Sequence, residues 1–342
     1  MPHDNAGHSL EEHVPAQRTV AIVVNPSKVV DLHRTRTRVE RYTRASGWSK
    51  PRWFETDRDD FGVAAALAAL ATNPDLVCVM GGDGTVRAVS SVLRGTSVSL
   101  ALLPSGTGNL LARNLGIPVD SVEEALEVAF LGQDRAIDVG LATFDDGEEH
   151  VFVVMSGVGL DAEIMAQTDD RLKKRVGWGA YVVAGGTRMF GKSFTATLTV
   201  DGEPHPPRES LMVLACNCSS VVANIELATG ALLDDELLEL VMLQPKAVIG
   251  WMGVAVDVAA GVRNGAASLG QWGGKDFHFE LDHPVLAEID GDPIGLTTSG
   301  HFSVDPGALL LRLPVPVKRN SVVRAARSAT TSADEILAAT GR

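Results

Sequence analysis

The sequence predicts a two-domain protein in which an α/β domain precedes a mainly β domain, and three features support this fold class. Residues 18–138 alternate apolar, strand-like runs with helical stretches, which is the order found in a parallel sheet. After Asp138 short apolar runs are separated by Gly, Pro and Asp, which is typical of antiparallel, sandwich-like structure. Three apolar runs of the first region end in loops rich in Gly, Asn or Pro. We therefore expect a Rossmann-like parallel sheet followed by an antiparallel β-sandwich.

The expected elements follow this order along the chain. Helices are predicted at residues 29–45, 60–71, 86–93, 110–115 and 121–131, and a further helical section is predicted at 162–190. Strands are predicted at 19–24, 76–80 and 98–103, and then at 151–155, 195–200, 211–216, 237–243, 277–281, 286–290 and 301–304. Asp120 or Ser121 suits an N-cap, and Glu123 and Glu124 suit the first turn that follows it. The polar residues 1–17 are expected to be disordered.

Composition argues against several classes of function. A net charge of −13 disfavours nucleic acid as the main partner, because phosphate binding needs a basic face. The three cysteines are few and unevenly placed, which suggests a reducing cytoplasm rather than a disulfide scaffold. No signal peptide is evident, and the longest apolar stretch, 247–262, is interrupted by Asp257 and is too short to span a bilayer. A cytoplasmic protein is expected.

The stretch Gly81-Gly82-Asp83-Gly84-Thr85 lies between a predicted strand and a predicted helix. Glycines let the backbone bend tightly and approach a ligand closely, because they carry no Cβ. The N–H groups at the start of the next helix have no partners within the helix and suit a phosphate. A carboxylate beside polyphosphate is repulsive unless a divalent cation lies between them, so Asp83 suggests Mg²⁺.

A second loop, Pro104-Ser105-Gly106-Thr107-Gly108-Asn109, follows the next strand, and Asn25-Pro26-Ser27 follows the first. Loops that follow parallel strands open on the same carboxyl edge of a sheet, where α/β folds bind ligands. The glycine spacing matches neither the P-loop nor the dinucleotide fingerprint. Three such loops in this order indicate a phosphate-binding edge of another kind.

These motifs resemble the catalytic domain of diacylglycerol kinases and their lipid-kinase relatives, including sphingosine and ceramide kinases. The soluble bacterial diacylglycerol kinases are the most similar. The resemblance continues through residues 135–140, 156–162, 228–240 and 288–292, so it covers roughly residues 18–315. The first glycine motif alone is also similar to NAD kinases and the phosphofructokinase-like superfamily.

The resemblance implies ATP on the first domain and lipid in a cleft between domains 18–138 and 139–308, with residues 309–342 returning to the first domain. Phosphoryl transfer requires in-line positioning, Mg²⁺ to neutralise charge and a group that takes the hydroxyl proton. The nucleotide-binding residues implied are Asn25, Pro26, Ser27, Thr56, Gly81, Gly82, Asp83, Gly84, Thr85, Gly106, Thr107 and Asn109.

The proton acceptor of the family comes from an Asp-Gly-Glu segment, which is Asp290-Gly291-Asp292 in this chain. We assign the base to Asp292, whose side chain is one methylene shorter than the family's Glu, with Asp290 as the competitor. Asp-Gly is also a strong hairpin signal, and a turn at this place is compatible with the catalytic role.

Two departures from the family pattern affect other contacts. Leu110 stands where the family commonly has Asp, which removes one polar contact from the cleft. In bacterial members an Asp and neighbouring carbonyls near residue 235 can hold a structural Mg²⁺. Asp235 with the carbonyls of Leu232 and Leu237 would be the equivalent set, but Glu236 replaces a glycine and restricts the backbone there.

The leading hypothesis is an ATP- and Mg²⁺-dependent lipid kinase that converts diacylglycerol to phosphatidic acid at the inner membrane surface through transient, peripheral contact. A kinase of the same fold acting on a sphingoid base, phosphatidylglycerol or NAD is one alternative. A nucleotide- or lipid-binding regulator without catalysis is another. Whether the protein forms a homodimer stays open.

Overall fold

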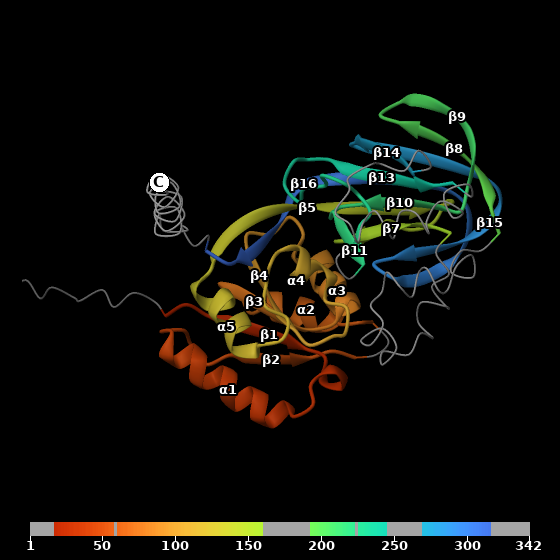
Figure 1. The fold of residues 1–342 in the computed structure, drawn as a ribbon. Coiled ribbons are helices and arrows are strands. Elements are labelled where there is room, and N and C mark those ends of the chain that lie inside the picture. The colour runs from red at the N-terminus through yellow and green to blue at the C-terminus, as the bar shows by residue number, and fades with distance from the viewer. Residues whose placement is uncertain (1–16, 58–59, 160–191, 223–224, 245–268, 316–342) are drawn as a thin grey trace, which may run out of the picture.

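The computed structural model describes residues 17–57, 60–159, 192–222, 225–244 and 269–315, and Figure 1 shows their arrangement. A helix-covered sheet formed by the first part of the chain adjoins an almost purely stranded second part. This confirms the predicted fold class. The helical section expected at 162–190 and the apolar stretch 247–262 lie outside the described residues.

Four parallel strands in the order β4-β3-β1-β2 form the sheet of the first part: β1 (Val20–Val24), β2 (Arg52–Glu55), β3 (Leu76–Gly81) and β4 (Ser99–Pro104). All residues of β1 and β3 are buried, as expected for parallel strands covered on both faces. Helices α2 (Val63–Leu70) and α3 (Asp83–Leu93) pack on one face. Helices α1 (Leu32–Ala45) and α5 (Val122–Leu131) pack on the other (Figure 1).

The helix termini follow the local sequence signals. Ser121 caps α5, and its hydroxyl accepts a hydrogen bond from Glu124 N at 3.2 Å. Helix α3 begins at Asp83, three residues before the expected start, because the extended backbone of Gly82 already serves as its N-cap. The last three residues of the glycine motif, Asp83-Gly84-Thr85, therefore belong to the first turn of the helix itself.

The second part is a two-layer arrangement of antiparallel strands. The strands are β5 (Gln133–Phe144), β6 (His150–Phe152), β7 (Met155–Val158), β8 (Phe194–Val200), β9 (Glu203–Ser210), β10 (Met212–Cys216), β11 (Ser220–Val222), β12 (Ile225–Glu226), β13 (Leu238–Leu243), β14 (Leu269–Gly274), β15 (Asp276–Ile289) and β16 (Asp292–Leu313). One core cluster joins the layers and contains Phe152, Phe194, Phe277, Phe279 and Phe302. Cys216 and Cys218 are buried free thiols, and so is Cys78 in the first sheet.

Strands β15 and β16 are longer than the sequence indicates. The two strands predicted at 277–281 and 286–290 form one strand with an irregular register between Glu280 and Val285. The polar break at Asp282-His283-Pro284 produces this irregularity but does not end the strand, because β16 pairs with residues on both sides of it. Strand β9, rich in proline, was not predicted. Among the strands that the structure describes, it pairs with β8 alone, and such an edge position tolerates proline.

Strand β16 connects the two parts of the molecule. Its first half pairs with β15, and Leu311 near its end pairs in parallel with Leu100 of β4. The parallel sheet and the second part therefore share one hydrogen-bonded path of strands. The beginning of β16 lies in the second part and its end in the first (Figure 1). Within the described ranges, no helix has both the length and the apolar character needed to cross a bilayer.

Candidate active site

Three loops meet at the carboxyl edge of the parallel sheet. Asn25 N donates to Met80 O at 2.8 Å, which places the loop after β1 beside the end of β3. Ser105 N donates to Gly81 O at 3.1 Å, which places the loop after β4 on the other side. Thr56 follows β2 at the same edge, and its N–H donates to Val24 O at 2.9 Å. The structure thus brings together the loops that the sequence analysis assigned to a nucleotide.

The first glycine loop folds tightly around Thr85. A Cβ at Gly81 would lie 2.6 Å from Cβ of Thr85, so only glycine fits there. The Thr85 hydroxyl is 3.4 Å from Nδ2 of Asn25, which ties this loop to the one after β1. On the other side, a Cβ at Gly62 would approach Thr56 Cγ2 to 2.7 Å.

The two glycine loops are in direct backbone contact. A Cβ at Gly106 would lie 2.5 Å from Cα of Gly82, a clash that no side-chain movement can relieve. Asn109 stabilises the second loop from within, because its amide accepts from Gly106 N at 3.0 Å and donates to Gly106 O at 2.8 Å. Thr107 is exposed at the tip of this loop.

Asp83 links the two loops, which the sequence did not predict. Its carboxylate accepts hydrogen bonds from Asn109 N at 2.9 Å and Leu110 N at 2.7 Å, the first N–H groups of the short helix α4 (Leu110–Asn114). Burial raises the pKa of Asp83, and these N–H bonds oppose the shift. A Cβ at Gly108 would lie 2.6 Å from Oδ2 of Asp83. The Leu110 substitution leaves this contact intact, because the backbone makes it.

A tight hairpin joins β15 to β16 beside these loops. Asp290 and Gly291 have φ angles of 48° and 88° between the paired residues Ile289 and Asp292, as in a type I′ turn. The predicted Asp-Gly turn is confirmed.

The two carboxylates of this hairpin have opposite environments. Asp290 is buried and accepts from the N–H groups of Val153, Val154 and Met155 at 3.1, 2.9 and 3.0 Å. Burial raises its pKa to about 6, while Arg87 and these N–H groups oppose the shift. The side chain of Asp292 is 45% exposed and points to the first glycine loop. Its Oδ2 is 3.1 Å from where a Cβ at Gly84 would lie.

Arg87 of α3 holds this hairpin against the first domain. Its guanidinium donates to the carbonyl oxygen of Ile289 and, at 2.8 Å, to Oδ2 of Asp292. The Arg87 side chain is only 17% exposed. The sequence analysis missed this residue. No local signal marks it, because Arg87 lies beyond the first turn of α3, where the effect of the helix terminus has faded.

Glu288 is a second residue that the sequence analysis did not single out. It is 1% exposed, and its Oε2 accepts from Gly291 N at 2.6 Å. Its Oε1 has no hydrogen-bond partner among the described residues. Burial raises the pKa of Glu288 to about 8, with the N–H of Gly291 opposing and Asp290 adding to the shift. The raised pKa favours the protonated, neutral form of Glu288, which limits the negative charge beside Asp290 and Asp292.

We expect the Glu288→Gln variant to lose a pH dependence of folding stability. Because the folded-state pKa exceeds the ordinary value of 4.5, the folded protein holds a proton that the unfolded chain has released. Stability therefore falls as pH rises toward 8, by about 1 kcal/mol per pH unit between pH 6 and 8. Glutamine cannot titrate and should flatten this slope in denaturant unfolding. Glu280→Gln, on the exposed face of the same strand, is the control, and equal slopes in all three proteins would contradict the assignment.

The residues that the sequence analysis assigned to Mg²⁺ near position 235 form a hydrogen-bonded loop. Asp235 Oδ1 accepts from Leu237 N at 3.2 Å, and Glu236 has a φ of 63°, the left-handed conformation that glycine favours. Buried Asp138 organises the loop, with Oδ2 accepting from Glu236 N at 2.7 Å. Leu232 is exposed and lines a cavity of about 280 Å³ between α4, β5 and residues 231–234. Cation binding at Asp235 stays a prediction.

Comparison with known proteins agrees with this geometry. Residues 19–142 match the family model of the diacylglycerol kinase catalytic domain. The chain is 29% identical over 254 residues to a "Probable lipid kinase YegS-like" of Klebsiella pneumoniae. The matched stretch covers 72% of this chain and 80% of the relative. A "Probable lipid kinase YegS" of Salmonella newport is 29% identical over 250 residues, 70% of this chain and 78% of the relative. A crystal structure of a diacylglycerol kinase from Bacillus anthracis has the same fold, with a TM-score of 0.70 at 22% identity over 88% of this chain and 98% of that one.

Proposed function

We propose that this chain is a lipid kinase of the diacylglycerol kinase type, which transfers the γ-phosphate of ATP to the free hydroxyl of diacylglycerol. The match of residues 19–142 to the diacylglycerol kinase catalytic domain and the likeness to relatives named probable lipid kinases support this proposal. The product would be phosphatidic acid. The observation that carries the proposal is the approach of Asp292 to Gly84. It places an exposed carboxylate of the second domain against the first glycine loop, which we propose binds the phosphates of ATP.

The donor nucleotide fits the edge of the parallel sheet. The first N–H groups of α3, in the Gly82–Thr85 turn, suit phosphate oxygens, and the absence of a Cβ at Gly82 and Gly84 allows close approach. Asn25, Ser27 and Thr56 border the same edge and would line the nucleotide site.

The charge at this site fits a divalent cation. Asp83 and Asp292 come close enough for the charge of Asp292 to contribute to the raised pKa of Asp83. Mg²⁺ would relieve this repulsion and would neutralise the phosphates when bound, which is its usual contribution to phosphoryl transfer. The remaining lone pairs of Asp83 are the groups that would hold it.

On the acceptor side, we propose that Asp292 accepts the hydroxyl proton. Arg87 donates a hydrogen bond to its Oδ2, and no hydrogen bond among the described residues engages Oδ1, which would be left for the substrate. A base must reach the hydroxyl directly or through one water. Asp290 has neither the exposure nor a free orientation for this role, because three backbone N–H groups hold its buried carboxylate.

Exposed apolar side chains near Asp292 support an apolar acceptor. Ile294 and Leu296, two and four residues beyond Asp292, are 41% and 69% exposed. Phe61 is 53% exposed and lies 3.7 Å from where a Cβ at Gly84 would be. Such side chains at the mouth of the site would contact acyl chains during a transient visit to the membrane surface from the cytoplasm.

The test is transfer of labelled γ-phosphate from ATP, with Mg²⁺, to diacylglycerol, sphingosine, ceramide, phosphatidylglycerol and NAD. Label entering diacylglycerol supports the proposal. Label entering only another acceptor keeps the kinase and replaces the substrate. Nucleotide binding without label in any acceptor would instead indicate a regulator that binds nucleotide without turnover.

A further inference from the structure

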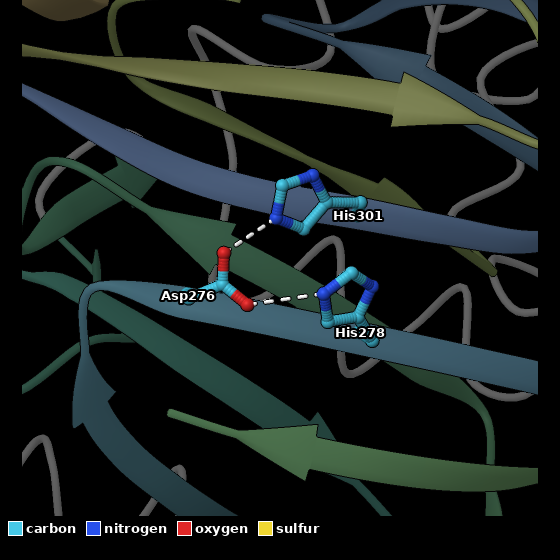
Figure 2. A group of neighbouring side chains, drawn as sticks. All are labelled: Asp276, His278 and His301. Atoms are coloured by element: carbon cyan, nitrogen blue, oxygen red, sulfur yellow. Dashed lines mark hydrogen bonds and ion pairs between the residues drawn. The ribbon is translucent and has the colours of Figure 1, made fainter. Parts of the chain in front are cut away.

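We propose that Asp276, His278 and His301 form a binding site for a divalent transition-metal ion of the zinc class. The three residues lie on the outer face of the second domain, and Figure 2 shows both imidazoles turned toward the one carboxylate. One ligand atom from each residue lies within 4.8 Å of the other two. Across the parts of the chain that the structure describes, this is the one group of three His, Cys, Asp or Glu side chains with such spacing.

The distances between these side chains are close to those around a bound ion. Nε2 of His278 is 3.1 Å from Oδ1 of Asp276, and Nε2 of His301 is 2.6 Å from Oδ2. The two rings are stacked at 12°, with centroids 4.2 Å apart. Zinc binds nitrogen and oxygen at about 2.0–2.2 Å, so two ligands of one ion are roughly 3–4 Å apart. Small rotations of the side chains are therefore enough to bring all three onto a single ion.

The strands position these ligands rigidly. His278 and His301 are directly paired across β15 and β16. The residues that alternate with them, Phe277, Phe279 and Phe302, are buried in the core, which fixes which face each imidazole occupies. Sites built on strands in this way keep their geometry better than sites on loops.

The backbone of Asp276 is held by a further contact. Asp201 N donates to Asp276 O at 2.8 Å, and Oδ1 of Asp201 accepts from Asp276 N at 2.9 Å. The carboxylate therefore projects from a fixed point at the start of β15.

The donor set determines the class of ion. Imidazole and carboxylate together suit Zn²⁺, Ni²⁺ or Cu²⁺, whereas Mg²⁺ and Ca²⁺ prefer oxygen ligands throughout. The side chains of His278, Asp276 and His301 are 58%, 43% and 36% exposed, so an ion can enter from solvent and keep water as a further ligand. The adjacent cation, Lys275, is directed to Glu236 at 2.8 Å rather than to the site.

The site is independent of the phosphoryl-transfer chemistry. His278 and the turn at Asp290 lie toward opposite ends of β15, separated by roughly 35 Å of extended strand. An ion there would tie β15 to β16 and stabilise the second domain. The proposal therefore does not depend on the identity of the lipid acceptor.

The test is calorimetric titration of Zn²⁺ into the chelator-treated, full-length protein. The wild type, a His278→Gln/His301→Gln double variant and a His283→Gln control are compared. His283 is an exposed imidazole on the same strand, 2.8 Å from Asp282, and forms a pair rather than a group of three. His3, His8 and His13 are present in all three proteins, so zinc bound by these residues cancels in the comparison.

We expect the double variant to lose one bound Zn²⁺, or to bind it at least about 100-fold more weakly, while the control matches the wild type. Zn²⁺ should also raise the melting temperature of the wild type and the control more than that of the double variant. Because both imidazoles are on the surface, the metal-free proteins should unfold at similar temperatures. Identical isotherms and identical zinc-induced shifts in all three proteins would overturn the proposal.

Discussion

Replacing Asp292 with asparagine should lower the turnover number of the kinase by roughly 10²–10⁴-fold, the range expected when a general base is removed. The amide has nearly the same shape and can still accept from Arg87, but it cannot take the hydroxyl proton. The folded structure should be unchanged, since the side chain is 45% exposed and is held by one guanidinium contact. The measurement is the initial rate of phosphate transfer, together with KM for ATP.

Asp305→Asn is the matched control for this prediction. Asp305 lies on the same strand, β16, and also pairs with an arginine, Arg94, but it lies away from the glycine loops. We expect it to retain near wild-type turnover. If Asp292→Asn raises KM for ATP while turnover is unchanged, Asp292 contributes to nucleotide or cation binding and is not the base. A variant with wild-type values of both parameters would remove Asp292 from the mechanism.

Asp290→Ala should produce the largest loss of stability, about 3–5 kcal/mol in the free energy of unfolding. The substitution leaves the N–H groups of Val153, Val154 and Met155 buried without their acceptor and opens a cavity between the hairpin and β7. Each unsatisfied buried donor costs about 1–3 kcal/mol. Denaturant unfolding followed by circular dichroism measures the effect.

Asp292→Ala serves as the control for stability, because it removes an aspartate side chain only two residues after Asp290. We expect it to unfold within about 0.5 kcal/mol of the wild type, because surface substitutions rarely cost more. A comparable loss of stability in both variants would mean that the two carboxylates are not divided into one structural and one reactive group.

Much of the candidate site could be predicted from the sequence because its signals are local. The glycine loop at residues 81–85 and the turn at Asp290-Gly291 are each specified by neighbouring residues whose backbone conformations glycine permits. The meeting of three loops at one edge follows from the parallel order of the strands that precede them. These are the parts in which the predictions and the structure agree.

The contacts that were missed join residues far apart in the chain. Arg87 reaches Asp292 across 205 positions, and Asp290 reaches the backbone of residues 153–155 across about 136. Asp83 was expected to face phosphate, and its hydrogen bonds to Asn109 and Leu110 depend on how two loops dock. The raised pKa of Glu288 likewise depends on burial by other elements, which no feature of its own segment indicates.

The sequence by itself determined the order of most strands and helices and the glycine turns, because backbone sterics and hydrophobic periodicity act over short stretches of chain. The resemblance to diacylglycerol kinases added Asp290 and Asp292 as candidates for the base. Only the tertiary structure shows that those two residues have different surroundings. The hairpin inserts Asp290 among backbone donors of residues 153–155, between the end of β6 and the start of β7, and leaves Asp292 facing the glycine loop, where Arg87 orients it. The same is true of Asp276, His278 and His301, which strand pairing alone brings within reach of one ion. Charge, desolvation and proximity are properties of the packed molecule, so the surroundings of each candidate residue could not be predicted from the sequence alone.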